Sequence, residues 1–383
     1  RERDIGPAEE PHFPVGQLRT AMAHEIDEGL GHVPPPGRDS VWIGVKWEHK
    51  YTSERGNRHM TMKILVVTCP APESVRKAVE EGAGGALAVR FLDDVPQEKR
   101  GEALSSANAL LSFFFNREVR EEEYAFLQGL ELFQSISAGL DYLPFEKMPG
   151  GMVIAGNAGG WAPQIAEHTM ALLLALTRRI VPLQNGMAKG RFDRGMFALR
   201  SLRGRVLTVA GYGGIGRSTA ELARAFGMRV WALNTSGRTD GEVDFIGTLD
   251  SLQGLLPGTD VLLLSLPLNR HTRGIIGRRE LELMKKDAIL LNVARAPLVD
   301  EEALYVHLKE NPEFLAGLDV WWKEPTWGGG DFVLGHPFLD LPNVAGSPHN
   351  SNRCEKDMEL AARAAASNVA AFFGNRPCVG IIR

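Results

Sequence analysis

Residues 205–216 read RVLTVAGYGGIG and decide the fold class of the chain. The first six residues are an apolar run that predicts a buried strand, and the next six fit the pattern G-x-G-x-x-G. A helical pattern follows at residues 215–226, and a second apolar run follows at residues 229–233. In such a setting the three glycines permit, in order, a tight turn, close approach of backbone to a pyrophosphate, and packing of helix on strand. With 42 glycines in 383 residues the pattern alone is weak. A glycine-rich turn without a ligand is the alternative, but the setting predicts a dinucleotide site.

Apolar runs that predict strands alternate with helical patterns from residue 62 onward. The predicted strands are residues 63–68, 87–91, 109–115, 130–137, 152–155, 205–210, 229–233, 261–266, 288–293, 315–320 and 344–347. Helices are predicted at residues 74–81, 163–179, 215–226 and 355–373. Near-continuous apolar strands separated by amphipathic helices are typical of parallel sheets covered on both faces. The sequence therefore predicts an α/β fold with two Rossmann- or flavodoxin-like domains.

Residues 1–61 differ from the rest of the chain. They contain the run PPPG at residues 34–37 and show no sustained period of 2 or 3.6. We expect this segment to be a disordered or non-native extension.

The composition excludes several classes of partner. Hydrophobic residues make up 44% of the chain and the net charge is −4, which gives no electrostatic footprint for nucleic acid or for an anionic membrane. The longest apolar run, residues 170–176, is far shorter than the roughly 20 residues of a membrane span. The isolated cysteines, Cys69, Cys354 and Cys378, form no CxxC spacing, so a reducing cytosol is the expected location. We expect a cytoplasmic enzyme without a metal, a nucleic-acid partner or a membrane partner.

Arg295, Glu324 and His349 follow the last three predicted strands. Because the carboxyl ends of parallel strands line the ligand crevice of an open sheet, we expect these side chains near one another. The guanidinium fork of Arg295 can hold a substrate carboxylate and polarise the adjacent C2 oxygen. His349 can exchange the hydroxyl proton, since histidine titrates near neutral pH. Glu324 can hydrogen-bond the far ring nitrogen and stabilise the imidazolium. This set predicts reversible oxidation of a 2-hydroxy acid.

Each of these residues also has a structural interpretation. Arg295 could cap a helix or pair with Asp300. Glu324 could be a solvated loop carboxylate. His349 follows Pro348 and could be a loop histidine with no chemical role.

Three segments carry a resemblance to a known family. They are NVARAPLVD at residues 292–300, GLDVWWKEP at 317–325 and SPH at 347–349. Together they resemble the signatures of the D-isomer-specific 2-hydroxyacid dehydrogenase family, and the resemblance covers residues 62–383. It places the family's catalytic arginine, glutamate and histidine on Arg295, Glu324 and His349.

The resemblance also implies an architecture. A dinucleotide-binding domain, residues 161–349, would be inserted into a substrate domain formed by residues 62–160 and 350–383. It implies a homodimer. The substrate carboxylate would contact Arg295 and the backbone near Asn116, Ala138 and Gly139.

The expected cofactor site combines the glycine motif with the loops that follow the later strands. The residues expected to contact the cofactor are Gly211, Gly213, Gly214, Ile215, Gly216, Asn234, Thr235, Ser236, Arg238, Leu266, Pro267, Thr272, Val293, Ala294, Arg295, Asp319 and His349. Where NAD-specific sites carry an acidic residue that repels a 2′-phosphate, this chain has the neutral Asn234, and Arg238 can pair with the phosphate. Asp240 and Glu242 lie near enough in sequence to weaken that attraction. NADP(H) is therefore predicted over NAD(H).

The expected reaction is that of a glyoxylate or hydroxypyruvate reductase. A phosphoglycerate dehydrogenase is the nearest alternative, but it would need extra basic residues, for which Arg117 is the one evident candidate in the first-domain loops. A dinucleotide-sensing corepressor, a binding protein of the same fold, is a second alternative. The stretch from Trp327 to Gly330 lengthens the loop between Glu324 and His349 relative to the family, so we expect a reshaped entrance to the site.

Overall fold

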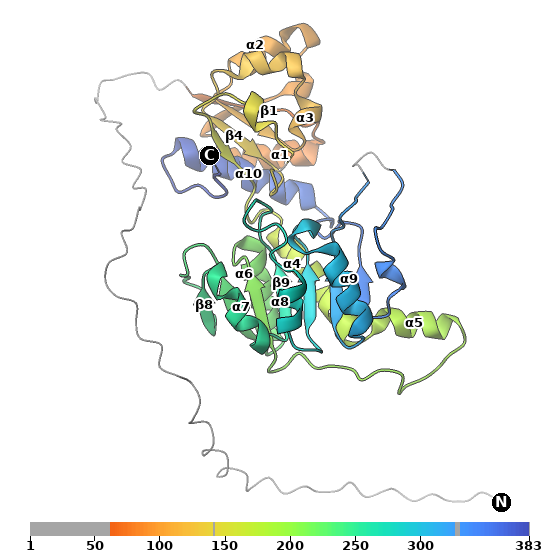
Figure 1. The fold of residues 1–383 in the computed structure, drawn as a ribbon. Coiled ribbons are helices and arrows are strands. Elements are labelled where there is room, and N and C mark those ends of the chain that lie inside the picture. The colour runs from red at the N-terminus through yellow and green to blue at the C-terminus, as the bar shows by residue number, and fades with distance from the viewer. Residues whose placement is uncertain (1–61, 141, 326–329, 383) are drawn as a thin grey trace, which may run out of the picture. The chain divides into compact units, whose positions relative to one another are not determined.

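The strands of the chain form two separate parallel sheets (Figure 1). The computed structural model describes residues 62–140, 142–325 and 330–382, so the prediction for residues 1–61 lies outside the described residues. One sheet has five strands in the order β2-β1-β3-β4-β5, and the other has seven in the order β12-β11-β10-β9-β6-β7-β8. These are the strand orders of flavodoxin-like and Rossmann folds. The predicted fold class is confirmed.

The central strands are buried on both faces, which explains their continuous apolar runs. The strands of the first sheet are β1 (Lys63–Val67), β2 (Leu87–Phe91), β3 (Ala109–Ser112), β4 (Leu132–Ser135) and β5 (Val153–Ala155). Those of the second sheet are β6 (Val206–Ala210), β7 (Arg229–Leu233), β8 (Phe245–Gly247), β9 (Val261–Leu264), β10 (Ile289–Asn292), β11 (Leu315–Leu318) and β12 (Val344–Gly346). β8 was not predicted, because a partly exposed edge strand of three residues has no apolar run.

Helices cover both sheets. The α-helices are α1 (Glu73–Ala83), α2 (Arg100–Ser105), α3 (Phe115–Glu118), α4 (Ala162–Thr177), α5 (Ile180–Ala188), α6 (Gly214–Ala225), α7 (Leu252–Leu255), α8 (Arg278–Leu283), α9 (Glu301–Glu310) and α10 (Asp357–Phe373). α4 packs on α6 and on β11 and β12 of the second sheet. α10 is last in the chain yet packs on α1 and β4 of the first sheet, where Asn368 Nδ2 donates to Gln134 Oε1 over 2.7 Å. All described residues nevertheless belong to one compact unit, so domain boundaries at residues 160 and 349 stay a prediction.

Several predicted elements end early, and contacts or backbone geometry explain two of these ends. The strand predicted at residues 109–115 stops at Ser112, because the Glu118 carboxylate binds the next two backbone N–H groups and turns the chain out of the sheet. Phe113 to Phe115, the last three residues of the predicted strand, therefore lie outside β3. The helix predicted at residues 163–179 ends at Thr177, because Arg179 adopts a left-handed conformation, with φ of 51°, before α5 begins.

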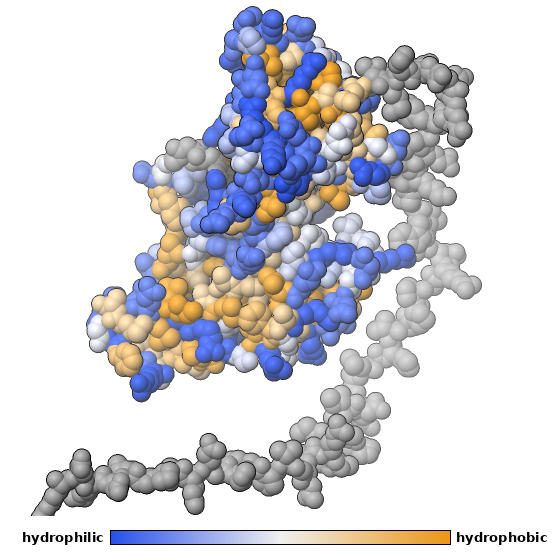
Figure 2. Space-filling model, turned by 180° about the vertical axis from the view of Figure 1, so that it is seen from behind, coloured by the Kyte–Doolittle hydropathy of each residue, from blue (hydrophilic) through white to orange (hydrophobic). Residues whose placement is uncertain are grey.

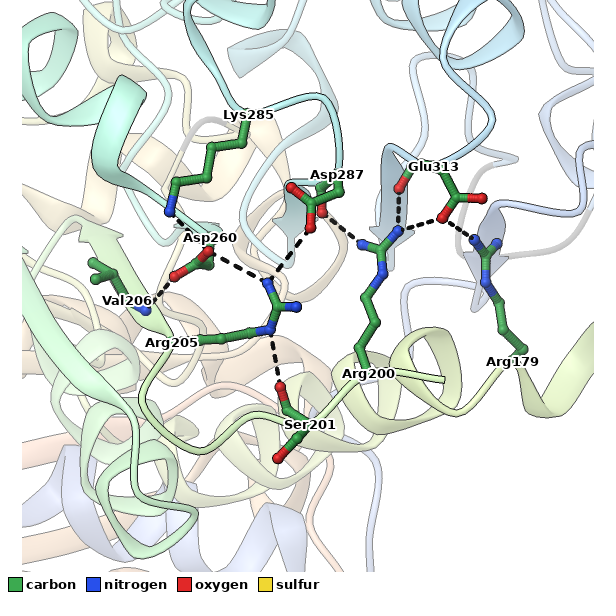
Figure 3. A network of polar contacts seen from close by, with 9 residues as sticks. All are labelled: Arg179, Arg200, Ser201, Arg205, Val206, Asp260, Lys285, Asp287 and Glu313. Atoms are coloured by element: carbon green, nitrogen blue, oxygen red, sulfur yellow. Dashed lines mark hydrogen bonds and ion pairs between the residues drawn. The ribbon is translucent and has the colours of Figure 1, made fainter. Parts of the chain in front are cut away.

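An ionic network fixes the amino edge of the second sheet (Figure 3). Arg200 donates to the carbonyl oxygens of Asp287 and Glu313 over 2.5 and 2.6 Å, and Arg205 lies 3.3 Å from the Asp260 carboxylate. Asp260 directly precedes β9, and Asp287 and Glu313 each lie two residues before β10 and β11. The network ties the chain that follows α5 to this edge. Ligands of such sheets bind at the opposite, carboxyl edge.

Candidate active site

The glycine motif forms the turn between β6 and α6. Gly211 has φ of +103°, which L side chains rarely adopt, and a Cβ there would lie 2.5 Å from the Ser265 carbonyl oxygen. A Cβ at Gly216 would lie 2.5 Å from the Gly211 carbonyl oxygen. Gly213 differs, since no atom of the described residues lies within 4 Å of its missing Cβ. Packing thus requires the first and third glycines, while the second leaves open backbone at the start of α6. This arrangement fits a dinucleotide pyrophosphate.

Gly214 and Ile215 open α6. A Cβ on Gly214 would lie 2.6 Å from the Gly159 Cα, so this glycine allows the helix to approach the chain that precedes α4. Ile215 is half-buried and packs against the larger hydrophobic core. The positions of both agree with a phosphate-binding turn, and their contact with a cofactor stays a prediction.

Glu324 and His349 form a hydrogen-bonded pair at the carboxyl ends of two neighbouring strands. Glu324 Oε2 lies 2.7 Å from His349 Nδ1, and the other carboxylate oxygen accepts the Trp321 N–H over 2.8 Å. The two side chains are 30% and 28% exposed, so they face solvent only in part. Glu324 follows β11 and His349 follows β12, strands that pair in register. A carboxylate so placed fixes the ring orientation and stabilises a positive imidazole.

A second carboxylate holds the loop that carries the histidine. His349 has φ of 51°, a left-handed conformation that few non-glycine residues adopt. Asp319 has no exposed surface, and its Oδ1 accepts the Ser347 hydroxyl over 2.7 Å and the Asn350 N–H over 3.1 Å. His168 Nε2, from α4, lies 2.8 Å from the same serine hydroxyl. The Asp319 side chain was predicted to contact the cofactor. That contact stays a prediction; the carboxylate is enclosed by protein and binds Ser347, Asn350 and Ser351 on either side of His349.

Arg295 follows β10, the strand next to β11. Its side chain is half-buried, and Nη1 donates to the Ala294 carbonyl oxygen over 2.8 Å. Asn292 Nδ2 donates to the Arg295 carbonyl oxygen over 3.0 Å. Asp300, the alternative partner, caps α9 by accepting the Ala303 N–H over 2.8 Å. The three predicted catalytic residues therefore follow three consecutive strands of the sheet.

A pocket of about 460 Å³ opens beside the Glu324–His349 pair. Its other walls are mainly apolar and include Trp321, Phe332 and Leu339. Of the lengthened loop at residues 327–330, only Gly330 is among the described residues.

Comparison with known proteins places the chain in a family. The profile of the NAD binding domain of D-isomer specific 2-hydroxyacid dehydrogenases matches residues 170–351. A glyoxylate reductase of Thermococcus litoralis is 30% identical over 319 residues, which cover 80% of this chain and 93% of that protein. The chain belongs to the D-isomer specific 2-hydroxyacid dehydrogenase family. The predicted resemblance is confirmed.

Two further relatives show how far the likeness extends. A D-3-phosphoglycerate dehydrogenase of Methanocaldococcus jannaschii is 30% identical over 313 residues, but the chain spans only 57% of its length. The solved structure of an acyclic imino acid reductase (Bsp5) in complex with NADPH and D-Arg has a TM-score of 0.65 and 26% identity. That likeness covers 84% of this chain and 100% of the other.

The loop after β7 is organised around Asn234. Its Oδ1 accepts the N–H groups of Ser236 and Gly237 over 3.1 and 2.7 Å, and its Nδ2 donates to the Arg238 carbonyl oxygen over 2.8 Å. Thr235, Ser236 and Arg238 are exposed around this turn. The side chain of Asn234 thus shapes the loop that would face the adenosine ribose in this family.

The acidic residues that follow this loop are already paired. Asp240 Oδ1 lies 2.7 Å from Arg217 Nη1, and Glu242 Oε2 lies 2.7 Å from Arg224 Nη2. Hydrogen bonding to Arg217 lowers the pKa of the Asp240 carboxyl. Both arginines come from α6. These pairs reduce the repulsion that Asp240 and Glu242 would exert on a phosphate near Arg238.

The other predicted cofactor residues lie in the loops after β9 and β10. Thr272 is buried, accepts the Asn269 N–H over 2.9 Å and donates to the Pro267 carbonyl oxygen over 2.7 Å, so it fixes the shape of its loop. Leu266, Val293 and Ala294 are buried and Pro267 is exposed. Contact of these residues with a cofactor stays a prediction.

The predicted substrate loops of the first sheet contact each other. Asn116 Nδ2 donates to the Tyr142 carbonyl oxygen over 2.7 Å, and the Tyr142 hydroxyl donates to the Phe113 carbonyl oxygen over 3.0 Å. Ala138 is exposed and Gly139 half-buried in the loop after β4. The structure thus brings the segment of Asn116 beside that of Ala138.

Sequence reasoning missed Glu118 and the supporting role of Asp319. Glu118 receives four hydrogen bonds at the carboxyl ends of β1 and β3. A single glutamate in a polar stretch carries no motif, so the sequence offers no signal for it. The aspartate lies in a family motif, GLDV, but the motif alone does not say what its carboxylate binds.

Metal and membrane sites have no candidates in the described ranges. Across residues 62–140, 142–325 and 330–382, no three His, Cys, Asp or Glu side chains gather as a metal would require. None of the helices within those ranges has the length and apolar character to cross a bilayer.

Proposed function

We propose that this chain transfers a hydride between NAD(P)H and C2 of a small 2-keto or 2-hydroxy acid. The observation that carries the proposal is the 2.7 Å contact between Glu324 and His349 at the carboxyl edge of a Rossmann sheet. Arg295 follows the adjoining strand, and the glycine turn before α6 opens at the carboxyl end of β6. The carboxyl edge of this sheet therefore carries a proton carrier (His349), a cation (Arg295) and a turn suited to a dinucleotide.

Each residue has a defined part in the proposed reaction. The nicotinamide, when bound, supplies or accepts the hydride. Arg295 holds the substrate carboxylate and draws electron density from the C2 oxygen. With Nδ1 engaged by Glu324, His349 exchanges the proton of that oxygen through Nε2, donating in reduction and accepting in oxidation. Glu324 stabilises the charged ring between these steps.

We propose glyoxylate- or hydroxypyruvate-like acids as substrates. The named glyoxylate reductase relative supports this class, since the chain covers 93% of that protein. The phosphoglycerate dehydrogenase relative gives weaker support for a phosphorylated substrate, since the chain spans only 57% of the length of that protein. Arg117, the candidate phosphate ligand, lies with its guanidinium 5.5 Å from the centre of the Phe114 ring.

We propose NADPH as the preferred cofactor. Asn234 is neutral and holds a loop that carries exposed hydroxyl groups and Arg238. Asp240 and Glu242 are each paired with an arginine of α6, so the expected repulsion is reduced. The NADPH bound to the imino acid reductase is consistent with this preference.

We also propose that the enzyme is a homodimer. Residues 180–199, named the arm here, contain five large apolar side chains that are at least 43% exposed. They are Ile180, Val181, Met187, Phe192 and Leu199. Figure 2 shows apolar residues interspersed with polar ones on the visible face of the molecule. Exposed apolar side chains that gather in a patch mark interaction sites. The buried side chains of Arg179 and Arg200, which flank the arm, bind Glu313 at the amino edge of the sheet and so anchor both ends of the arm (Figure 3).

One assay tests the proposal. The purified full chain is supplied with glyoxylate, hydroxypyruvate, 3-phosphohydroxypyruvate and pyruvate, each with NADPH and with NADH. We expect the highest kcat/KM for an unphosphorylated acid with NADPH, and loss of that activity in His349→Asn. Tight NADPH binding without turnover of any acid would overturn the proposal and favour a dinucleotide-sensing binding protein.

A further inference from the structure

Glu118 joins the ends of two strands in the first sheet. Its Oε2 accepts the hydroxyls of Thr68 and Ser112 over 2.7 and 2.6 Å and the Phe113 N–H over 3.1 Å. Its Oε1 accepts the Phe114 N–H over 2.6 Å. Thr68 follows β1 and Ser112 ends β3, strands that pair directly. One carboxylate therefore fixes both segments at the carboxyl edge of this sheet.

The four donors around Glu118 require a carboxylate rather than an amide. The Thr68 and Ser112 side chains are buried, with 4% and 0% of their residues' surface exposed. Buried hydroxyls need an acceptor, and losing one leaves a polar group unsatisfied. The Thr68 hydroxyl also lies 3.3 Å from the Leu111 carbonyl oxygen, so it is the Ser112 hydroxyl that depends most on Glu118. A carboxylate has enough lone pairs for four donors, whereas a glutamine amide has one accepting oxygen and would turn two donor hydrogens toward this cluster.

A chain of hydrogen bonds leads from Glu118 to the loop after β4. The peptide group between Phe113 and Phe114 is held by Glu118 through the Phe114 N–H, and its carbonyl oxygen accepts the Tyr142 hydroxyl over 3.0 Å and the Ser137 hydroxyl over 3.5 Å. Asn116 Nδ2 binds the Tyr142 carbonyl oxygen over 2.7 Å. Ser137 directly precedes Ala138, where the substrate carboxylate is expected.

We infer that Glu118 is a positioning residue for the substrate side of the site. It does not contact the reacting atoms. It holds Phe113 so that the segment of Asn116 and the segment of Ala138 and Gly139 keep one relative position. This inference rests on the proposed function, since it assigns the two segments to the substrate carboxylate.

Glu118→Gln is the primary test, with Glu121→Gln as the matched control. Glu121 undergoes the same change three residues later, where it is exposed and forms an ion pair with Lys147 over 2.7 Å. For Glu118→Gln we expect KM for the best 2-keto acid to rise about tenfold and kcat to fall less than about threefold. The Kd for NADPH, measured by fluorescence titration, should match that of the control. If Glu118 only stabilised the fold, its replacement would not raise KM while leaving kcat and the Kd for NADPH nearly unchanged.

Tyr142→Phe provides an independent variant if Glu118→Gln does not fold. It removes the hydroxyl that binds Phe113 and lies 3.0 Å from the Ser135 hydroxyl. We expect a KM increase of about threefold with unchanged affinity for NADPH. Because both residues act through Phe113, the double variant should raise KM by less than the product of the single effects.

Hydrogen exchange of the full chain, together with the kinetics, distinguishes failure of the proposed function from failure of the role inferred for Glu118. Loss of Glu118 should speed exchange in residues 112–118 and 135–142 while residues 205–216 stay as in the control. If neither wild type nor Glu121→Gln turns over a 2-keto acid, the proposed function fails. If wild type is active and Glu118→Gln keeps the control's KM and exchange, Glu118 is no positioning residue. A rise in KM accompanied by an equal loss of NADPH affinity would likewise overturn the inference.

Discussion

His349 combines a left-handed backbone with a carboxylate bound at Nδ1. Asparagine tolerates this backbone better than most residues, so His349→Asn should keep the loop and remove only the proton carrier. We expect kcat to fall by about 10²- to 10⁴-fold, the usual contribution of general acid–base catalysis. NADPH affinity should stay at the wild-type value. Steady-state kinetics and fluorescence titration measure both, and an unchanged kcat would make the histidine a loop residue without a chemical role.

Glu324→Gln tests the partner of that histidine. A neutral amide stabilises the protonated ring less than a carboxylate does, so the ring loses its proton at lower pH. Reduction requires the protonated form, and the alkaline limb of its pH profile should therefore move to lower pH. The profile of kcat/KM from pH 5 to 10 measures the shift. Full activity with an unmoved profile would place Glu324 outside the site.

At the scale of elements, the proposed cofactor preference depends on the loop after β7. Asn234→Asp introduces a negative charge beside the expected 2′-phosphate while keeping an oxygen that can accept the N–H groups of Ser236 and Gly237. We expect the ratio of kcat/KM for NADPH to that for NADH to fall about tenfold or more. Arg238→Gln should raise the Kd for NADPH and leave that for NADH nearly unchanged. An unmodified protein that prefers NADH would contradict the assignment.

The sequence predicted the elements whose burial is uniform. β7 has the predicted bounds, and the strands after it shift by only one or two residues at their ends, because each is a continuous apolar run. β8 and α5 were missed, since both are partly exposed and lack a distinct pattern. The short helices α2, α3, α7 and α8 also had no predicted range. The end of β3 depends on Glu118, a contact that no local period encodes.

The same limit applies to the site. Arg295, Glu324 and His349 were predictable because strand ends in a parallel sheet share one edge. The 2.7 Å contact of the last two agrees with that reasoning. The supporting carboxylates were not predictable, because Glu118 binds a donor 50 residues away and Asp319 binds one 28 residues away. Such contacts depend on the packed tertiary structure.

At the scale of the whole molecule, the arm at residues 180–199 should decide the oligomeric state. Two charges introduced together, Ile180→Glu and Phe192→Glu, should destabilise an apolar interface and give a monomer by light scattering after gel filtration. Phe226→Glu is the control, since this exposed phenylalanine at the end of α6 lies outside the arm. A wild-type monomer would exclude the proposed dimer, and a double variant that stays dimeric would exclude the arm as its interface.

His307, a half-buried histidine, should contribute to the pH dependence of the free energy of unfolding. Burial lowers the pKa of His307 in α9, and among the described residues its Nε2 has no hydrogen-bond partner. The unfolded chain therefore takes up this proton first as pH falls below about 6.5, which favours unfolding. The contribution is fully present above that pH and is lost as pH falls toward the lowered pKa.

In His307→Leu the free energy of urea unfolding should decline less between pH 7.5 and 5.5 than in wild type. His271→Gln, a change at an exposed loop histidine, should keep the wild-type decline. Equal slopes for wild type and His307→Leu would show that His307 does not contribute to acid unfolding.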